Sequence, residues 1–173
     1  KIKLFLLVFF VLPFFAFSQG KVYKDTLIVR DAYTVLYSQL KGQPLMVTYT
    51  VLNKPSITDR RTLDFHKVEG VVTSFDGDYA YNELDKSHMA PAATFGYSWN
   101  HMNQTFEYIN IALQHQSLNR GVWKSLEVRE RVLSKMTPVH VTITLEFNDP
   151  NSKTEYGCLI PTAFYKILRY GLK

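Results

Sequence analysis

The strongest helix signal in the chain begins with Leu118-Asn119-Arg120-Gly121-Val122-Trp123-Lys124-Ser125-Leu126-Glu127. From Leu118 to Leu133, apolar side chains recur at helical spacing with charged residues between them. Asn119 stands at the start, where asparagine is a favoured N-cap. Thr137-Pro138 ends the pattern, because the residue before a proline avoids the helical region. The sequence therefore predicts one long helix over about residues 119–136.

Short runs rich in β-branched and aromatic residues lie on both sides of this helix, and such runs are typical of strands. The clearest is 139–147, in which apolar and polar residues alternate. Strands on both sides of one central helix predict an α+β fold with an antiparallel sheet. The predicted strands cover residues 27–30, 33–37, 46–51, 69–74, 106–112, 139–147 and 156–170, with loops over most of residues 53–85.

Residues 1–18 differ in composition from the rest of the chain. Two lysines precede an apolar run from Leu4 to Phe17, which ends in small residues and contains no acid. The run is short for a transmembrane helix and has the pattern of a secretory signal peptide, so residues 19–173 form the predicted domain. The alternatives are a buried N-terminal helix and a retained anchor. Signal cleavage would give a secreted or periplasmic protein without stable membrane association.

Length and composition describe ordinary globular material. A chain of 173 residues, 46% hydrophobic and 20% charged, favours one folded domain over a disordered or fibrous protein. A single cysteine, Cys158, excludes an intrachain disulfide, and no Cys/His cluster indicates structural zinc. Because two lysines and no acid lie in residues 1–18, the net charge of +5 falls to +3 without them. A charge of this size does not by itself indicate a nucleic-acid partner.

Three polar features stand out against this background. His88 lies in a charged segment, although a lone histidine is usually a satisfied surface residue. Asn110 lies inside an apolar run and must find hydrogen-bond partners, either as a structural bridge or as an aimed donor. Glu127 and Arg131 have the spacing of an ion pair on one helix face, so a capped helix with one such pair would also explain them.

Together and in this order, these segments resemble the DNA/RNA non-specific endonuclease family of ββα-metal nucleases, which includes endonuclease G-like enzymes. The family's metal block L-N-x-G-x-W-x-x-L-E is matched without a gap by residues 118–127. The signature D-R-G-H-x-A-P appears as Asp85-Lys86-Ser87-His88-Met89-Ala90-Pro91, and the block S-N-I-x-P-Q appears as Ile109-Asn110-Ile111-Ala112-Leu113-Gln114. The resemblance covers nearly all of residues 19–173.

The resemblance implies a ββα-metal nuclease fold and hydrolysis of DNA and RNA with little sequence specificity. It gives His88 the role of general base and Asn119 that of holding one Mg²⁺, with Mn²⁺ as a substitute. Glu127 would hold metal-bound waters and Asn110 would orient the His88 region or the phosphate. On this basis activity should fall below about pH 6, where a protonated histidine cannot act as base. The further implied roles are phosphate contact by Arg60, or nearly as well Arg61, substrate binding by Lys86, and fixing of the Glu127 charge by Arg131.

The chain departs from the family pattern at four points, one of which is Ala112-Leu113 in place of a residue-Pro pair, a change expected to alter only a turn. Lys86 replaces the usual Arg and loses bidentate phosphate recognition. Ser87 replaces the usual Gly and would be strained if that position needed a positive φ. The chain stops at Lys173, before the family's usual length, so an edge strand or final helix is expected to be missing. These departures leave two alternatives open: a non-catalytic remnant that binds nucleic acid, and a structural secreted protein.

Overall fold

The computed structural model describes residues 23–171, so the predicted signal peptide lies outside the described residues. The strands are β1 (Asp25–Val29), β2 (Tyr33–Ser38), β3 (Gln43–Val51), β4 (Leu84–His88), β5 (Ile111–His115), β6 (Val139–Glu146) and β7 (Ala163–Arg169). The α-helices are α1 (Trp99–Thr105), α2 (Gln116–Leu118) and α3 (Lys124–Leu133). Short 3-10 turns occur at Arg60–Thr62, Asp76–Tyr79, Ala92–Thr94 and Tyr108–Asn110, and a π-helical turn covers Asn119–Trp123.

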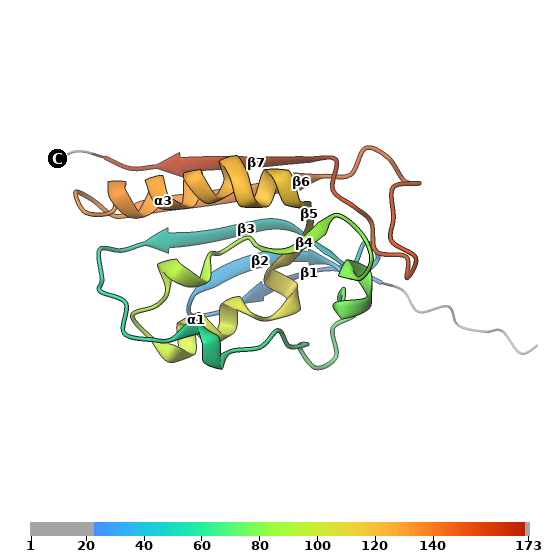
Figure 1. The fold of residues 1–173 in the computed structure, drawn as a ribbon, viewed down its shortest axis with the longest axis horizontal. Coiled ribbons are helices and arrows are strands. Elements are labelled where there is room, and N and C mark those ends of the chain that lie inside the picture. The colour runs from blue at the N-terminus through green and yellow to red at the C-terminus, as the bar shows by residue number, and fades with distance from the viewer. Residues whose placement is uncertain (1–22, 172–173) are drawn as a thin grey trace, which may run out of the picture.

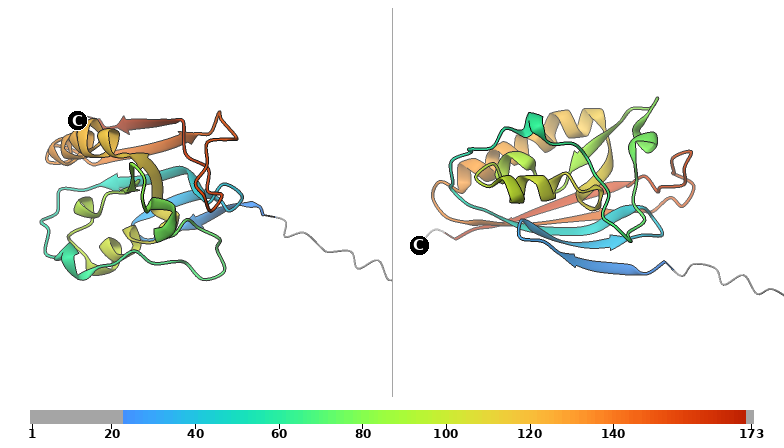
Figure 2. Two further views of the ribbon diagram at one scale, coloured as in Figure 1. Left: turned by 45° about the vertical axis from the view of Figure 1, so that its right-hand side comes forward. Right: turned by 90° about the horizontal axis from the view of Figure 1, so that it is seen from below.

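The strands form two antiparallel sheets. The larger has the order β1-β2-β3-β6-β7, and β4 pairs with β5 as a separate ribbon. All the helices lie on one face of the larger sheet (Figures 1 and 2). The predicted α+β fold with an antiparallel sheet is confirmed.

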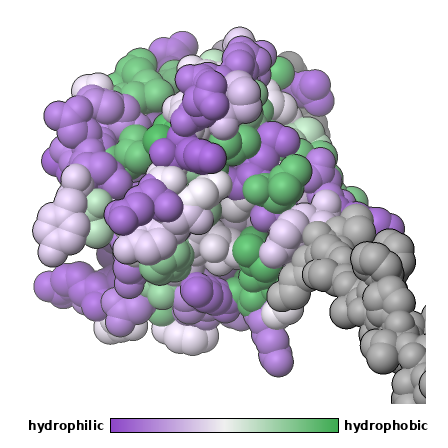
Figure 3. Space-filling model, turned by 90° about the vertical axis from the view of Figure 1, so that its right-hand side faces the viewer, coloured by the Kyte–Doolittle hydropathy of each residue, from purple (hydrophilic) through white to green (hydrophobic). Residues whose placement is uncertain are grey.

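The surface at the loop end of the sheet is predominantly hydrophilic, with hydrophobic residues scattered among polar ones (Figure 3). Such scattered apolar residues are normal on soluble domains and need no partner to explain them. Among residues 23–171, no helix has both the length and the apolar character needed to cross a bilayer.

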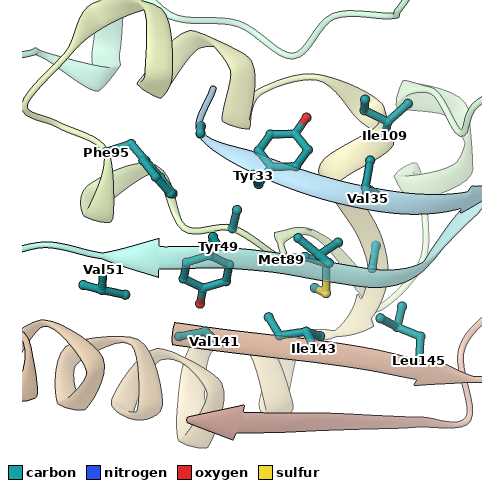
Figure 4. Close-up of a cluster of buried hydrophobic side chains, with 14 of the residues drawn as sticks. Tyr33, Val35, Tyr49, Val51, Met89, Phe95, Ile109, Val141, Ile143 and Leu145 are labelled. Carbon is teal, nitrogen blue, oxygen red and sulfur yellow. The ribbon is translucent and has the colours of Figure 1, made fainter. Parts of the chain in front are cut away.

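The core lies between the larger sheet and the helices. Alternate residues of a strand face the same side, so β2, β3 and β6 each present a row of buried side chains to the helical layer. Burial of each Val, Leu or Ile in these rows contributes about 1.5–3 kcal/mol. The rows contain Tyr33, Val35, Tyr49, Val51, Val141, Ile143 and Leu145, and Met89, Phe95 and Ile109 belong to the same cluster (Figure 4).

A buried ion pair between Glu130 of α3 and Lys166 of β7 joins the helix to the sheet. Glu130 is fully buried and accepts hydrogen bonds from Tyr49 Oη and Lys166 Nζ, both at 2.7 Å. The Lys166 ammonium lies 4.1 Å from the ring centre of Trp123. Because each buried charge is paired, loss of either partner would cost about 3–5 kcal/mol. This network fixes how α3 is rotated on the sheet, and therefore the direction of Glu127 one turn earlier.

The sequence located most of the larger sheet but not all strand limits. The runs 33–37 and 46–51 fall within β2 and β3, the run 27–30 extends one residue beyond β1, and 139–147 coincides with β6 to within one residue. The predicted strand at 69–74 is wrong, because that segment carries no strand. The run 156–170 is too long, since only Ala163–Arg169 pairs with β6.

Two further differences concern the site. The strand predicted at 106–112 begins only at Ile111, because a 3-10 turn over Tyr108–Asn110 precedes it. The long helix predicted over 119–136 is a π-helical turn followed by α3, which ends at Leu133.

Candidate functional site

A cavity of about 650 Å³ lies where the end of β4 meets the first turns of α3 and the 3-10 turn at Arg60. Five basic and two acidic side chains line it, so the cavity is suited to an anionic ligand such as phosphate. Another cavity, of about 540 Å³ near α1, contains none of the predicted site residues. The lining of the first consists of Arg60, Phe65, Asp85, Lys86, His88, Pro91, Ala92, Ala93, Asn119, Arg120, Lys124, Glu127 and Arg131.

His88 is the last residue of β4 and is held there by pairing with Ile111 of β5. Its ring packs against Phe65 and Phe106, with centroid distances of 5.3 and 4.9 Å. Burial, with a smaller contribution from the charge of Arg60, lowers the pKa of His88 to about 3. Its Nε2 atom is buried and has no hydrogen-bond partner among the described residues. The ring is therefore neutral at physiological pH and has a nitrogen free to accept a proton.

Asn110 fixes the chain immediately after His88 and does not reach the cavity. Its Oδ1 accepts from the backbone N–H of Ala90 at 2.8 Å. Its Nδ2 donates to the carbonyls of Ala90 and Thr105 at 3.0 and 2.8 Å. These bonds use the whole amide and satisfy it in a fully buried position. Of the two roles that the sequence offered for Asn110, its contacts agree with orienting the His88 segment and not with contacting the phosphate.

Asn119 is not the helix N-cap that its position in the sequence predicted. The helical conformation begins earlier, at α2, and Asn119 itself has helical φ/ψ of −60° and −49°. The helix is interrupted two residues later, where Gly121 has φ −97° and ψ −111°. Because its side chain is not used to cap the helix, Asn119 extends toward β4 and lines the cavity.

Two residues of β4 hold the Asn119 amide. Its Nδ2 donates to Asp85 Oδ2 at 2.9 Å, and Asp85 also forms a bidentate ion pair with Arg120 at 2.9 and 2.7 Å. The hydrogen bond from Arg120 is the main reason that the pKa of Asp85 is lowered, so this carboxylate only accepts. The amide nitrogen must therefore face Asp85. The carbonyl Oδ1 then faces the Ser87 hydroxyl, at 3.0 Å.

Ser87 occupies this position without backbone strain. It lies in the middle of β4, and Tyr81 is the one non-glycine residue with a positive φ within the described part of the chain. The strain that a Gly-to-Ser change could have caused is absent there.

Glu127 lies on α3, three residues before the buried Glu130, and lines the cavity. Burial is the main cause that raises the pKa of Glu127 to about 7, against the opposing positive charge of Lys166. The ion pair predicted from the spacing of Glu127 and Arg131 is wrong, since none joins them within 4.0 Å in residues 23–171. Nη1 of Arg131 is instead buried without a partner. Both side chains nevertheless line the cavity.

The two neighbouring arginines before the histidine segment have different surroundings. Arg60 lines the cavity. Arg61 does not, because it forms an ion pair with Asp59 at 2.7 Å on an exposed surface. Of the two arginines, only Arg60 is therefore placed to contact a ligand bound in the cavity.

Lys86 lines the cavity but its ammonium group is already engaged. It pairs with Asp76 and lies 4.8 Å from the ring centre of Phe65. The same Asp76 accepts a hydrogen bond from Tyr108. A phosphate at this side of the cavity would have to compete with Asp76 for Lys86.

A comparison with protein families matches residues 13–170 to the DNA/RNA non-specific endonucleases. The chain belongs to that family. The resemblance drawn from the histidine and metal blocks is thereby confirmed, and β4, β5 and α3 are the strands and helix of a ββα-metal fold.

Two relatives of the chain carry the name mitochondrial endonuclease G. The endonuclease G proteins of Homo sapiens and Bos taurus are each 30% identical over 125 residues, which cover 64% of this chain and 42% of each relative. The chain thus spans less than half the length of these curated relatives. A solved structure of an EndoG/EndoGI complex, described by its mechanism of EndoG inhibition, has a TM-score of 0.75 and 25% identity. The matched region covers 84% of this chain and 67% of the chain in the solved structure.

The donor set around Asn119 fits a hard divalent cation. Asn119 and Glu127 contribute the carbonyl and carboxylate oxygens that Mg²⁺ and Mn²⁺ prefer. The described residues contain no group of three or more His, Cys, Asp or Glu side chains that could enclose a metal ion. Mg²⁺ keeps several waters and needs few protein ligands, so one amide oxygen with a nearby carboxylate suffices.

Sequence reasoning gave no role to several of the residues that line this cavity. Asp85 was visible in the histidine block, but its contact with Asn119 depends on strand and helix meeting in space. Arg120 and Lys124 had a usable signal, since they precede Glu127 and Arg131 at helical spacings of three and four along one face. Phe65 carried no signal, because a lone aromatic in a polar segment has no distinctive pattern.

Proposed function

We propose that this chain is an exported endonuclease that uses a divalent cation, Mg²⁺ or Mn²⁺, to hydrolyse phosphodiester bonds in DNA and RNA. The observation that carries the proposal is the convergence of a neutral His88, Asn119 and Glu127 on one basic cavity. A helix cap and a surface histidine in a structural protein would have no reason to meet there. Export is inferred from the signal-like pattern of residues 1–18 alone.

His88 is assigned the role of general base. Hydrolysis of a phosphodiester needs removal of a proton from the attacking water, which a neutral imidazole nitrogen can accept. The neutral imidazole of His88, which lines the cavity, would supply that acceptor. Phe65 and Phe106 hold the ring, and Asn110 holds the backbone beyond it, so the orientation of the imidazole is fixed.

The other residues bind the phosphate and the cation. When bound, the cation would neutralise charge on the phosphate and on the departing 3′ oxygen. Asn119 would hold it through Oδ1, and the carboxylate of Glu127 would hold its water molecules. Arg60, which also lines the cavity, would contact the phosphate. These groups address phosphate and metal and do not address base edges, so discrimination among sequences should be weak.

The direct test is cleavage of supercoiled plasmid DNA and of a long RNA by residues 19–173, with Mg²⁺, with Mn²⁺ and with a chelator. Both substrates should be cut at many positions in either metal and left intact by the chelator. Full cleavage in the presence of the chelator, or cutting at one short sequence only, would contradict the proposal.

One observation favours a non-catalytic remnant as the second candidate. Two of the five basic side chains that line the cavity already form ion pairs, Lys86 with Asp76 and Arg120 with Asp85. A chain whose phosphate contacts are weakened in this way would bind nucleic acid without cutting it. Retained DNA binding with no cleavage under any divalent cation would identify this alternative.

The pH profile should be set by Glu127 and not by His88. A raised pKa means that Glu127 gains its proton as the pH falls through about 7, and the neutral acid no longer holds cation-bound water. His88 remains neutral throughout this range. At low Mg²⁺ the rate should therefore fall as pH drops below about 7, earlier than the limit near pH 6 expected from an ordinary histidine.

Initial rates between about pH 5 and pH 9, at two Mg²⁺ concentrations, provide the measurement. Higher Mg²⁺ should move the acid limb to lower pH, because a bound cation favours the carboxylate form. An acid limb that stays in place at both concentrations would show that another group controls it.

A further inference from the structure

The Ser87 hydroxyl lies between two side-chain amides in the ribbon beneath the cavity. It is 3.0 Å from Asn119 Oδ1 and 2.9 Å from Gln114 Oε1, and both Ser87 and Gln114 are almost wholly buried. A hydroxyl carries one proton, so it can donate to only one of these oxygens. The other amide must present a donor to it, or two unprotonated oxygens face each other.

The hydrogen bond between Asn119 and Asp85 determines which of the two side-chain amides must rotate. Because Asn119 Nδ2 is committed to the carboxylate of Asp85, the Asn119 carbonyl cannot exchange places with its nitrogen. Gln114 has no such constraint, and its Nε2 is buried without a partner. With that amide rotated, Gln114 Nε2 donates to Ser87 Oγ, and Ser87 donates to Asn119 Oδ1. This arrangement gives the hydroxyl both a donor and an acceptor.

We propose that Ser87 is a positioning residue that fixes the carbonyl of Asn119 for cation binding and so sets the cation affinity of this endonuclease. The inference rests on the proposed function, in which Asn119 holds the cation. The Ser87 proton occupies one of the two lone pairs of Oδ1 and leaves the second for the cation. Together with Asp85 on the other end of the amide, it prevents rotation of the side chain. Glycine, the residue of the family signature, would supply no such bond.

The expected effect is on affinity and not on the chemical step. Partners that orient a metal ligand typically change metal affinity by about 10- to 100-fold when they are removed. Ser87→Ala should therefore raise the Mg²⁺ and Mn²⁺ concentrations needed for half-saturation by about 10-fold. At saturating cation the maximal rate should stay within about threefold of the wild type, because His88 and Glu127 are unchanged.

Cation binding is measured without substrate, by the rise of the unfolding temperature with added Mn²⁺ or Mg²⁺ and by calorimetric titration. Ser87→Gly serves as a second variant without the hydroxyl, in case the alanine variant folds poorly. Ser134→Ala is the matched control, because it removes another nearly buried hydroxyl hydrogen bond, to the carbonyl of Arg131, away from Asn119. Asn119→Ala marks complete loss of the proposed ligand.

Weaker cation binding in both Ser87 variants, with unchanged binding in Ser134→Ala, would support the proposal. Wild-type affinity in a folded Ser87 variant, while Asn119→Ala binds no cation, would overturn it and leave the proposed function standing. Absence of cation binding by the wild-type protein would overturn both.

Discussion

Replacing His88 with alanine is expected to lower the rate of DNA and RNA cleavage by at least about 10²-fold. General base catalysis by a positioned side chain typically contributes about 10²–10⁴-fold, and no other described side chain of the cavity lining combines a neutral acceptor nitrogen with burial. Cation binding should persist in His88→Ala, because Asn119 and Glu127 are untouched. The measurement is the single-turnover rate at saturating Mg²⁺.

A chemical rescue distinguishes lost catalysis from lost structure. Removal of the ring opens space beside Phe65 and Phe106, and free imidazole can enter it from the cavity. Added imidazole should restore part of the rate in His88→Ala and leave the wild type unchanged. His140→Ala is a suitable control, since this exposed histidine of β6 lies outside the cavity. Full activity in His88→Ala without imidazole would eliminate the base role.

The larger sheet was predictable because burial of one face forces alternation. β6 illustrates this: its residues alternate between buried and partly exposed along nearly the whole strand. β4 gives no such signal, although it carries His88. Its residues are Leu-Asp-Lys-Ser-His, and the polar ones are used for contacts with Asn119, Asp76 and the cavity. When most residues of a strand are polar residues of a site, the strand shows little of the apolar alternation by which strands are recognised.

Helix α1 was missed for a related reason. Its sequence, Trp-Asn-His-Met-Asn-Gln-Thr, consists mostly of weak helix formers, and only Met102 and Thr105 are buried. A signal did exist in Ser98, whose hydroxyl accepts from the N–H of His101 as an N-cap. In a seven-residue helix, one cap and two buried residues are too little to outweigh poor propensity in the sequence alone.

The candidate site was predictable in its composition but not in its connections. The family blocks named His88, Asn119 and Glu127, and the structure brings them to one cavity. Spacing alone suggested an N-cap for Asn119 and an ion pair for Glu127, and both suggestions were wrong. The kink at Gly121 and the buried pairing of Glu130 with Lys166 determine those side chains, and neither can be read from periodicity.

Replacing Asn119 with aspartate is expected to reduce cleavage by at least about 10²-fold, although a carboxylate is a good Mg²⁺ ligand. The reason is Asp85, whose Oδ2 lies 2.9 Å from Asn119 Nδ2 and requires a donor there. Two carboxylates so close either repel or share one proton, which raises the pKa of the pair. The variant should therefore lose the fixed orientation of its ligand oxygen, and its activity should depend on pH differently from the wild type.

The exchange variant Asp85→Asn with Asn119→Asp tests this reasoning. It keeps the total charge and restores one donor and one acceptor, now with the amide on β4 and the carboxylate on the helix. We expect it to recover at least about 10-fold of the activity lost in Asn119→Asp, with incomplete recovery because Arg120 loses its bidentate partner. Rates of the two single variants and the exchange variant at saturating Mg²⁺ give the coupling between the positions. If Asn119→Asp is as active as the wild type, Asp85 does not dictate the orientation of Asn119, and the amide itself is not needed to hold the cation.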